Sequence, residues 1–87
     1  MTQHFTHLAI IKRLKRASGH LNSVVSMLEE ERGCLEIAQQ LQAVESAITK
    51  AKKTLIHDHI DHCLEHSVTG KNAAKAIDEF KEITKYL

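Results

Sequence analysis

Hydrophobic residues recur at helical spacing between residues 34 and 66 of the chain. This stretch contains neither proline nor glycine, so nothing in it interrupts a helix. Its apolar residues return at steps of three and four, which places them on one stripe of a helix. The pattern therefore predicts one long helix over 34–66, with an apolar stripe at Leu35, Ala38, Leu41, Val44, Ile48, Ala51, Leu55, Ile60 and Leu64.

Two shorter amphipathic stretches flank this long helix. Thr6 is a suitable N-cap for a first helix that runs to about Glu31, and Asn72 for a short third helix. We expect residues 1–5 to form a mobile tail, and Gly33 to take the left-handed conformation that ends the first helix. The two flanking stripes are Leu8, Ile11, Leu14, Leu21, Val24, Val25 and Leu28, and then Ala76, Ile77, Phe80, Ile83 and Leu87.

Length and composition restrict the fold class. The chain has 87 residues with three glycines and no proline, which favours an all-α protein. A chain this small buries only about 60% of its unfolded surface, and three apolar stripes exceed what it can cover alone. We therefore predict a single domain over 1–87: a three-helix protomer with a long central helix, completed as an antiparallel bundle dimer.

Cysteine and histidine residues are concentrated in the long helix. Cys63 is four residues after His59, so both side chains project from one helical face. Cys34 precedes them by 25 and 29 residues, which along a continuous helix is roughly 38 and 44 Å. Because a metal–sulfur bond is only about 2.3 Å, one chain cannot bring all three to one ion. Two antiparallel copies can, which predicts a metal site of Cys34, His59 and Cys63 across a dimer interface.

Several functional classes are disfavoured. The sequence has no apolar run long enough to cross a membrane, and no nucleophile elbow, P-loop or dinucleotide fingerprint. We therefore expect neither an enzyme with a small-molecule substrate nor a membrane protein. A disulfide needs Cα atoms about 5.5 Å apart, which a straight helix between the two cysteines excludes. Reduced thiols indicate a cytoplasmic protein.

Basic residues are clustered although the net charge is only +1. In a lone chain such clusters form solvated surface, whereas a symmetric oligomer repeats them into an extended basic face. Such a face can bind a nucleic-acid backbone. The two clusters are Lys12, Arg13, Lys15 and Arg16 in the first helix, and Lys50, Lys52 and Lys53 in the second.

Three segments of the chain resemble the CsoR/RcnR family of metal-sensing transcriptional repressors. They read RLKRASGHL, SMLEEERGC and QLQAVESAITKAKKTLIHDHIDHC, and the ending DEFKEITKYL is similar to the nickel-resistance-associated branch. The resemblance implies disc-shaped tetramers, built as dimers of dimers, that bind operator DNA until an inducer releases them. The family's sensor positions fall on Cys34, His59 and Cys63.

The resemblance also implies roles for other residues. Arg13 matches a family arginine implicated in DNA binding, and a second positive position falls on Lys50. Glu79 matches an acid that couples the ligating histidine of copper sensors to the third helix. Gly33 departs from the copper sensors, which commonly have a tyrosine just before the first cysteine. With Lys12 and Arg16 from the basic cluster, Arg13 and Lys50 form the predicted DNA-binding set.

The donor set bears on which metal is sensed. Two thiolates and one imidazole suit three-coordinate Cu(I), our first expectation. His7 or His4 lies near a position that supplies an extra ligand in nickel and cobalt sensors. Adding either would give the four donors that square-planar Ni(II) prefers, which makes Ni(II) the second expectation. His20, His57, His62 and His66 are expected to be structural or solvated.

Two alternatives use the same scaffold. A thiol-based repressor could sense sulfide, persulfide or formaldehyde through Cys34 and Cys63. His59 is evidence against that reading, because the family's persulfide sensors lack this histidine. A metal-storage bundle without DNA binding is the other alternative, and the basic first helix is evidence against it. The favoured reading is a metal-responsive repressor of metal efflux genes.

Overall fold

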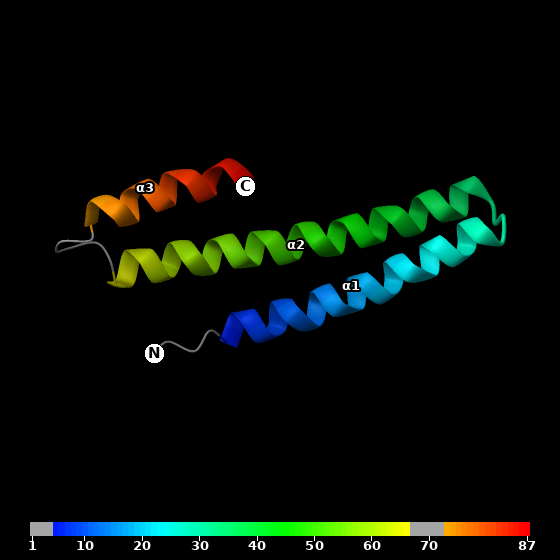
Figure 1. The fold of residues 1–87 in the computed structure, drawn as a ribbon, viewed down its shortest axis with the longest axis horizontal. Coiled ribbons are helices and arrows are strands. Elements are labelled where there is room, and N and C mark those ends of the chain that lie inside the picture. The colour runs from blue at the N-terminus through cyan, green and yellow to red at the C-terminus, as the bar shows by residue number, and fades with distance from the viewer. Residues whose placement is uncertain (1–4, 67–72) are drawn as a thin grey trace. The chain divides into compact units, whose positions relative to one another are not determined.

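A computed structural model describes residues 5–66 and 73–87, with side chains for residues 6–61 and 74–87. Its helices are α1 (Phe5–Glu29), α2 (Cys34–His66) and α3 (Ala73–Ile83), followed by a 3-10 helix at Thr84–Tyr86 (Figure 1). Within these described ranges there is no strand, so the predicted all-α class with a long central helix is confirmed. None of the described helices has the length and apolar character needed to cross a membrane.

The structure confirms the predicted bounds of the long helix and corrects the predicted start of the first helix. The long helix spans 34–66, as its uninterrupted helical pattern predicts. By contrast, α1 already includes Phe5, so Thr6 lies inside the helix and the N-cap prediction is wrong. Asn72 and the rest of the expected tail, residues 1–4, lie outside the described residues.

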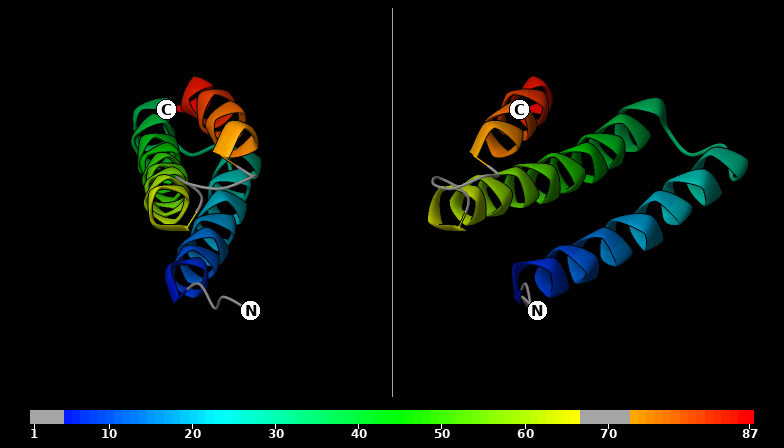
Figure 2. Two further views of the ribbon diagram at one scale, coloured as in Figure 1. Left: turned by 90° about the vertical axis from the view of Figure 1, so that its left-hand side faces the viewer. Right: turned by 60° about the vertical axis from the view of Figure 1, so that its left-hand side comes forward.

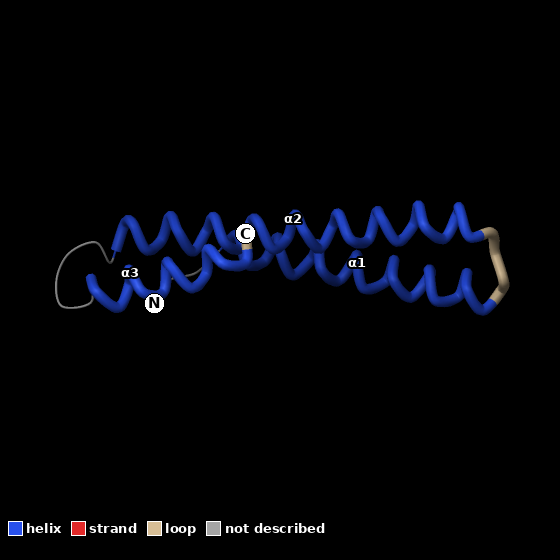
Figure 3. Tube along the Cα trace, turned by 90° about the horizontal axis from the view of Figure 1, so that it is seen from above, coloured by secondary structure: helices blue, strands red, loops and turns tan. Residues whose placement is uncertain are grey.

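The chain divides into two compact units, Met1–Ala51 and Lys52–Leu87. In the first unit, α1 and the N-terminal part of α2 run antiparallel as a hairpin (Figure 3). Val24 of α1 packs with Ile37 and Val44 of α2, and Met27 packs against this cluster. The buried residues of both helices in this unit are spaced seven apart, which is the spacing of a coiled-coil seam. We call them the inner seam: Ile10, Ala17, Val24, Ile37, Val44 and Ala51.

The structure corrects which apolar positions form the core. On α2 the prediction merged two faces: Val44 is buried, whereas Leu41, Ile48 and Leu55 are 43%, 46% and 41% exposed. These three are also spaced seven apart, and we call them the outer seam. On α1, six of the seven predicted stripe residues are exposed and only Val24 is buried. The exposed six are Leu8, Ile11, Leu14, Leu21, Val25 and Leu28.

The turn between α1 and α2 uses a different left-handed residue from the one predicted. Glu31 has a φ of 56°, and among the described residues other than glycine it is the one with a positive φ. The Arg32 amide donates to the Met27 carbonyl and the Glu31 amide to the Leu28 carbonyl, at 3.0 and 3.1 Å. This is the Schellman arrangement, in which Glu31 holds the position that glycine usually takes. Gly33 instead precedes α2, where its carbonyl accepts from the Ile37 amide.

The second unit contains residues 52–66 of α2 together with α3. The two helices lie side by side (Figure 2), and the pair His59 and Glu79 connects them. Ile56 is buried in this unit, and Phe80 and Ile83 of α3 are half-buried. Ile77 and Leu87, which the sequence assigned to the same stripe, are mostly exposed.

Candidate metal centre

The predicted metal ligands lie at opposite ends of α2. Cys34 is the first residue of the helix, and its thiol is free and exposed. His59 and Cys63 lie in the last two turns, one turn apart. Because α2 is unbroken, Cys34 is roughly 38 Å from His59 along the helix axis. Among the described side chains, no group of three or more His, Cys, Asp or Glu is arranged to hold a metal ion.

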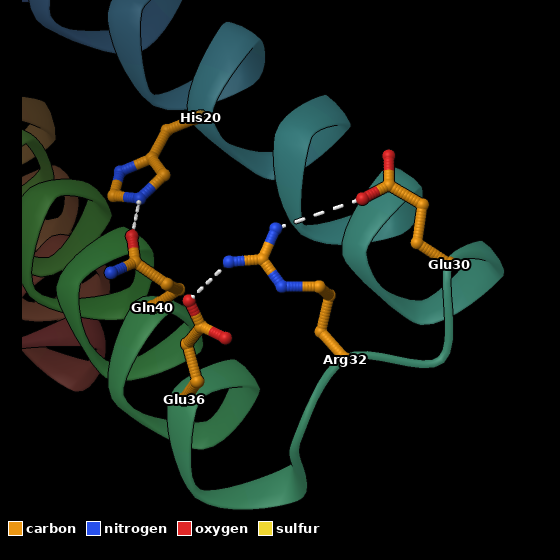
Figure 4. A network of polar contacts seen from close by, with 5 residues as sticks. All are labelled: His20, Glu30, Arg32, Glu36 and Gln40. Carbon is orange, nitrogen blue, oxygen red and sulfur yellow. Dashed lines mark hydrogen bonds and ion pairs between the residues drawn. The ribbon is translucent and has the colours of Figure 1, made fainter.

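The segment before Cys34 is fixed by the side chain of Arg32 (Figure 4). Arg32 Nη2 donates to Glu36 Oε2 at 2.6 Å, and Nη1 lies 3.6 Å from Glu30 Oε1. The first contact is an i,i+4 pair that connects the turn to the first turn of α2. Each is solvent-exposed and therefore contributes little stability. The Schellman bonds end α1, and the Arg32–Glu36 pair connects the turn that follows to α2. The turn thus places Cys34 at the start of the helix.

His59 is half-buried and faces α3. Its Nε2 lies 3.8 Å from Glu79 Oε2, too far for a hydrogen bond but close enough for a small movement to form one. Glu79 therefore lies beside the histidine with which the family resemblance paired it. Cys63 lies within the helical backbone of α2, and its side chain is outside the described residues.

The remaining histidines divide into three groups. His20 Nε2 lies 2.6 Å from Gln40 Oε1, which links α1 to α2 inside the first unit (Figure 4) and agrees with the expected structural role. His7 and His57 are exposed on α1 and α2. Of the others, His4 and the side chains of His62 and His66 are outside the described residues. A fourth ligand from His7 or His4 therefore stays a prediction.

The predicted DNA-binding residues are all exposed. Lys12, Arg13 and Arg16 lie within one and a half turns of α1, and Lys50 lies on α2 in the same unit. Three cations so close in sequence give α1 a basic surface. Their contact with DNA stays a prediction.

The sequence prediction missed the relation between the ligands and the outer seam. Leu41 follows Cys34 by seven residues, and His59 follows Leu55 by four. Cys34 and His59 therefore occupy the two ends of an exposed apolar stripe on one side of α2. The seven-residue spacing from Cys34 through Leu41, Ile48 and Leu55 was the signal that could have revealed it.

Together, the fold and these positions define an all-α protein with a cysteine donor at one end of an exposed helical seam and a histidine donor at the other. A model of the metal-sensitive transcriptional repressor family matches residues 6–86. The chain belongs to this family, whose members are transcriptional repressors rather than enzymes.

Named relatives and a solved structure agree with this assignment. The chain is 35% identical over 78 residues to the copper-sensing transcriptional repressor CsoR of Mycobacterium ulcerans (strain Agy99), covering 90% of this chain and 67% of that protein. It is 34% identical over 80 residues to CsoR of Bacillus subtilis (strain 168), covering 87% and 79%. The structure of the nickel-responsive transcriptional regulator InrS is similar, with a TM-score of 0.81, 26% identity, and 99% and 94% coverage. The chain spans about two thirds of the mycobacterial relatives' length.

Proposed function

We propose that this repressor holds operator DNA when metal-free and releases it on binding Cu(I), with Ni(II) as the second candidate inducer. The regulated genes would be those of metal efflux and resistance. The observation that carries the proposal is the position of Cys34 and His59 at the two ends of the outer seam of α2. Copper-sensing relatives and a nickel-responsive structural neighbour support both metals.

A second copy of the chain is needed to complete the site. Apolar stripes left exposed on a folded chain mark surfaces for association. When the outer seams of two antiparallel α2 helices pack together, the start of each helix lies beside the end of the other. Cys34 of one protomer then approaches His59 and Cys63 of the second, giving two such sites per dimer. The exposed stripe on α1 and the apolar residues of α3 offer further surface for a tetramer.

The donors determine which metal the site would hold. Two thiolates and an imidazole match the soft ligands that Cu(I) prefers. His59 would transmit metal binding to α3, because a metal-bound imidazole can donate its other N–H to Glu79. Ni(II) would need a further nitrogen donor, for which His7 and His4 are the candidates.

The basic surface of α1 would bind the operator. Arg13 and Lys50 are proposed to contact phosphates, with Lys12 and Arg16 adding positive charge. Lys50 would act as a point charge, because lysine lacks the bidentate fork of arginine. The reduced thiols would require a reducing compartment, which is the cytoplasm. A thiol-based sensor remains the second candidate, since Cys34 is free and exposed.

Metal titration of the reduced, anaerobic protein tests the inducer. We expect Cu(I) to bind with one equivalent per protomer and to release a fluorescent operator fragment. Ni(II) is the comparison, and a sulfide or formaldehyde donor tests the second candidate. Release by the sulfur or carbonyl reagent alone, without a response to either metal, would overturn the metal assignment.

Mixing two variants that each lack one ligand tests whether the site is shared between two protomers. The Cys34→Ala and Cys63→Ala chains should each lose more than about 100-fold in Cu(I) affinity, since even residues behind the ligands contribute about 10–100-fold. A mixed dimer has one site with all three donors, so tight binding should return to half of the sites in the mixed dimers. If every donor came from one chain, all sites in verified mixed dimers would stay broken.

A further inference from the structure

The outer seam does not by itself determine how two copies align. Leu41, Ile48 and Leu55 repeat every seven residues, so sliding one helix by seven sets apolar residues against apolar residues again. Each such register keeps two of the three apolar pairings, so the seam distinguishes the registers only weakly. The shared site, however, needs the one antiparallel register that brings Cys34 to the far end of the second helix. Some other feature must distinguish the registers.

Two opposite charges flank the outer seam on the same side. Glu45 follows Leu41 by four residues, and Lys52 follows Ile48 by four, so both lie beside the seam. Both are exposed, and within the described part of the chain neither has a hydrogen-bond or ion-pair partner. They are seven residues apart, about 10.5 Å along the helix, which is too far to pair with each other in one chain.

Their positions relative to the cysteines match. Glu45 lies eleven residues after Cys34, and Lys52 lies eleven residues before Cys63. In an antiparallel pair, a step forward on one helix corresponds to an equal step backward on the other. When Cys34 lies opposite Cys63 of the partner subunit, Glu45 therefore lies opposite Lys52 of the partner subunit. The two-fold symmetry of such a dimer repeats this pair.

The same two charges make the other antiparallel registers unfavourable. A slip of seven residues in one direction places Glu45 opposite Glu45 of the partner subunit. A slip of seven in the other direction places Lys52 opposite Lys52 of the partner subunit. Like charges at facing positions are unfavourable, so they select against each alternative.

We propose that Glu45 and Lys52 are positioning residues that set the antiparallel register of two α2 helices and so bring Cys34 opposite Cys63 of the partner subunit. The occupant of the outer seam is thus a second copy of this chain, selected by charge complementarity. This inference rests on the shared metal site proposed above. Neither residue contacts the metal in this arrangement.

Charge reversal gives a direct test by sedimentation of the full chain. The Glu45→Lys chain carries two lysines beside the seam, and the Lys52→Glu chain carries two glutamates. Each should self-associate at least tenfold more weakly than the unmodified protein at low salt. Their mixture should associate as mixed pairs, detected by native mass spectrometry, because each contact again joins Glu to Lys. The weakening should shrink in 1 M salt, where screening acts within about 3 Å.

Two further proteins serve as controls. The double variant Glu45→Lys/Lys52→Glu keeps composition and net charge and restores both pairs, so it should associate like the unmodified protein. Lys53→Glu makes the same charge change as Lys52→Glu one residue around the helix, and should leave self-association unchanged. Circular dichroism shows whether each variant folds. Unchanged self-association of both single variants, or a double variant that stays as weak as they are, would overturn the proposal.

A cross-link tests the register without metal. Cys63→Ala is added to the Glu45→Lys chain and Cys34→Ala to the Lys52→Glu chain, so each mixed pair has one Cys34 and one Cys63 on different chains. A short bismaleimide should join these thiols in the mixture, and absence of the cross-link in verified mixed pairs would overturn the register. Cu(I) is then added to the mixture that has not been cross-linked. Pairing and cross-linking without Cu(I) binding would support the register while refuting the shared metal site.

Discussion

The inner and outer seams of α2 share one spacing and one kind of residue, yet they differ in exposure. Val44 of the inner seam is 4% exposed, whereas Ile48 of the outer seam, one helical turn further along, is 46% exposed. In the first unit, Val24 and Met27 of α1 pack against Ile37 and Val44, the inner-seam residues of α2. No described residue covers the outer seam to the same extent. One helix thus encodes a folding surface and an association surface separately.

The largest effect should follow from a charge placed in the outer seam. Ile48 would lie near the two-fold axis of the antiparallel dimer, so Ile48→Lys would bury two ammonium groups close together. We expect the dimer to weaken by about 100-fold or more, equivalent to about 2.7 kcal/mol. Sedimentation velocity measures this, and Gln42→Lys, which adds the same charge to an exposed position away from both seams, is the control. A dimer unchanged by Ile48→Lys would contradict the assignment of the outer seam.

A smaller effect should follow from a truncation in the inner seam. Val44→Ala removes two methyl-sized groups from a packed position and should lower the free energy of unfolding by about 2 kcal/mol. Because the contact lies within one chain, this loss should not depend on protein concentration. Leu41→Ala is the matched outer-seam variant, and its loss should shrink as the protein is diluted, because it acts through association and vanishes once the unmodified protein is also monomeric. Urea denaturation at several protein concentrations separates the two variants. If both losses depended on protein concentration in the same way, the inner and outer seams would not differ in function.

The polar contact of the first unit should contribute less than its apolar contacts. His20→Ala removes the contact of His20 Nε2 with Gln40 Oε1, and we expect a loss of about 1 kcal/mol. Ser23→Ala, which removes an exposed hydrogen bond to the Gly19 carbonyl, should change stability by less than about 0.5 kcal/mol. A double-mutant cycle with Gln40→Ala measures the coupling. Zero coupling would show that His20 acts only by packing.

The smallest effect, in the opposite direction, is expected at the turn that places α1 on the inner seam. Glu31→Gly should raise the free energy of unfolding by about 0.5–1 kcal/mol, because glycine adopts positive φ without steric cost. Glu30→Gly is the control, since Glu30 does not have a positive φ, and it should be neutral or destabilising. Thermal unfolding gives both values. A lower melting temperature for Glu31→Gly would show that its side chain contributes more than the backbone strain removes.

Much of the local structure followed from sequence because it depends on neighbouring residues. The bounds of α2 were predictable because no proline or glycine interrupts 34–66. The position of the left-handed residue was not, because the Schellman bonds place it by where α1 ends rather than by where glycine occurs. The proximity of Glu79 to His59 followed from the family resemblance alone, since spacing cannot relate two helices.

The sequence by itself determined that three helices form, that apolar residues repeat along them, and that Cys34 and His59 occupy distant ends of α2. It did not determine which apolar repeat is buried. Helical periodicity defines how residues are distributed around an axis, but the two seams of α2 have the same period and differ only in phase. Only the packing of α1 against Ile37 and Val44 decided which seam is internal, because burial depends on the neighbouring helix rather than on the repeat.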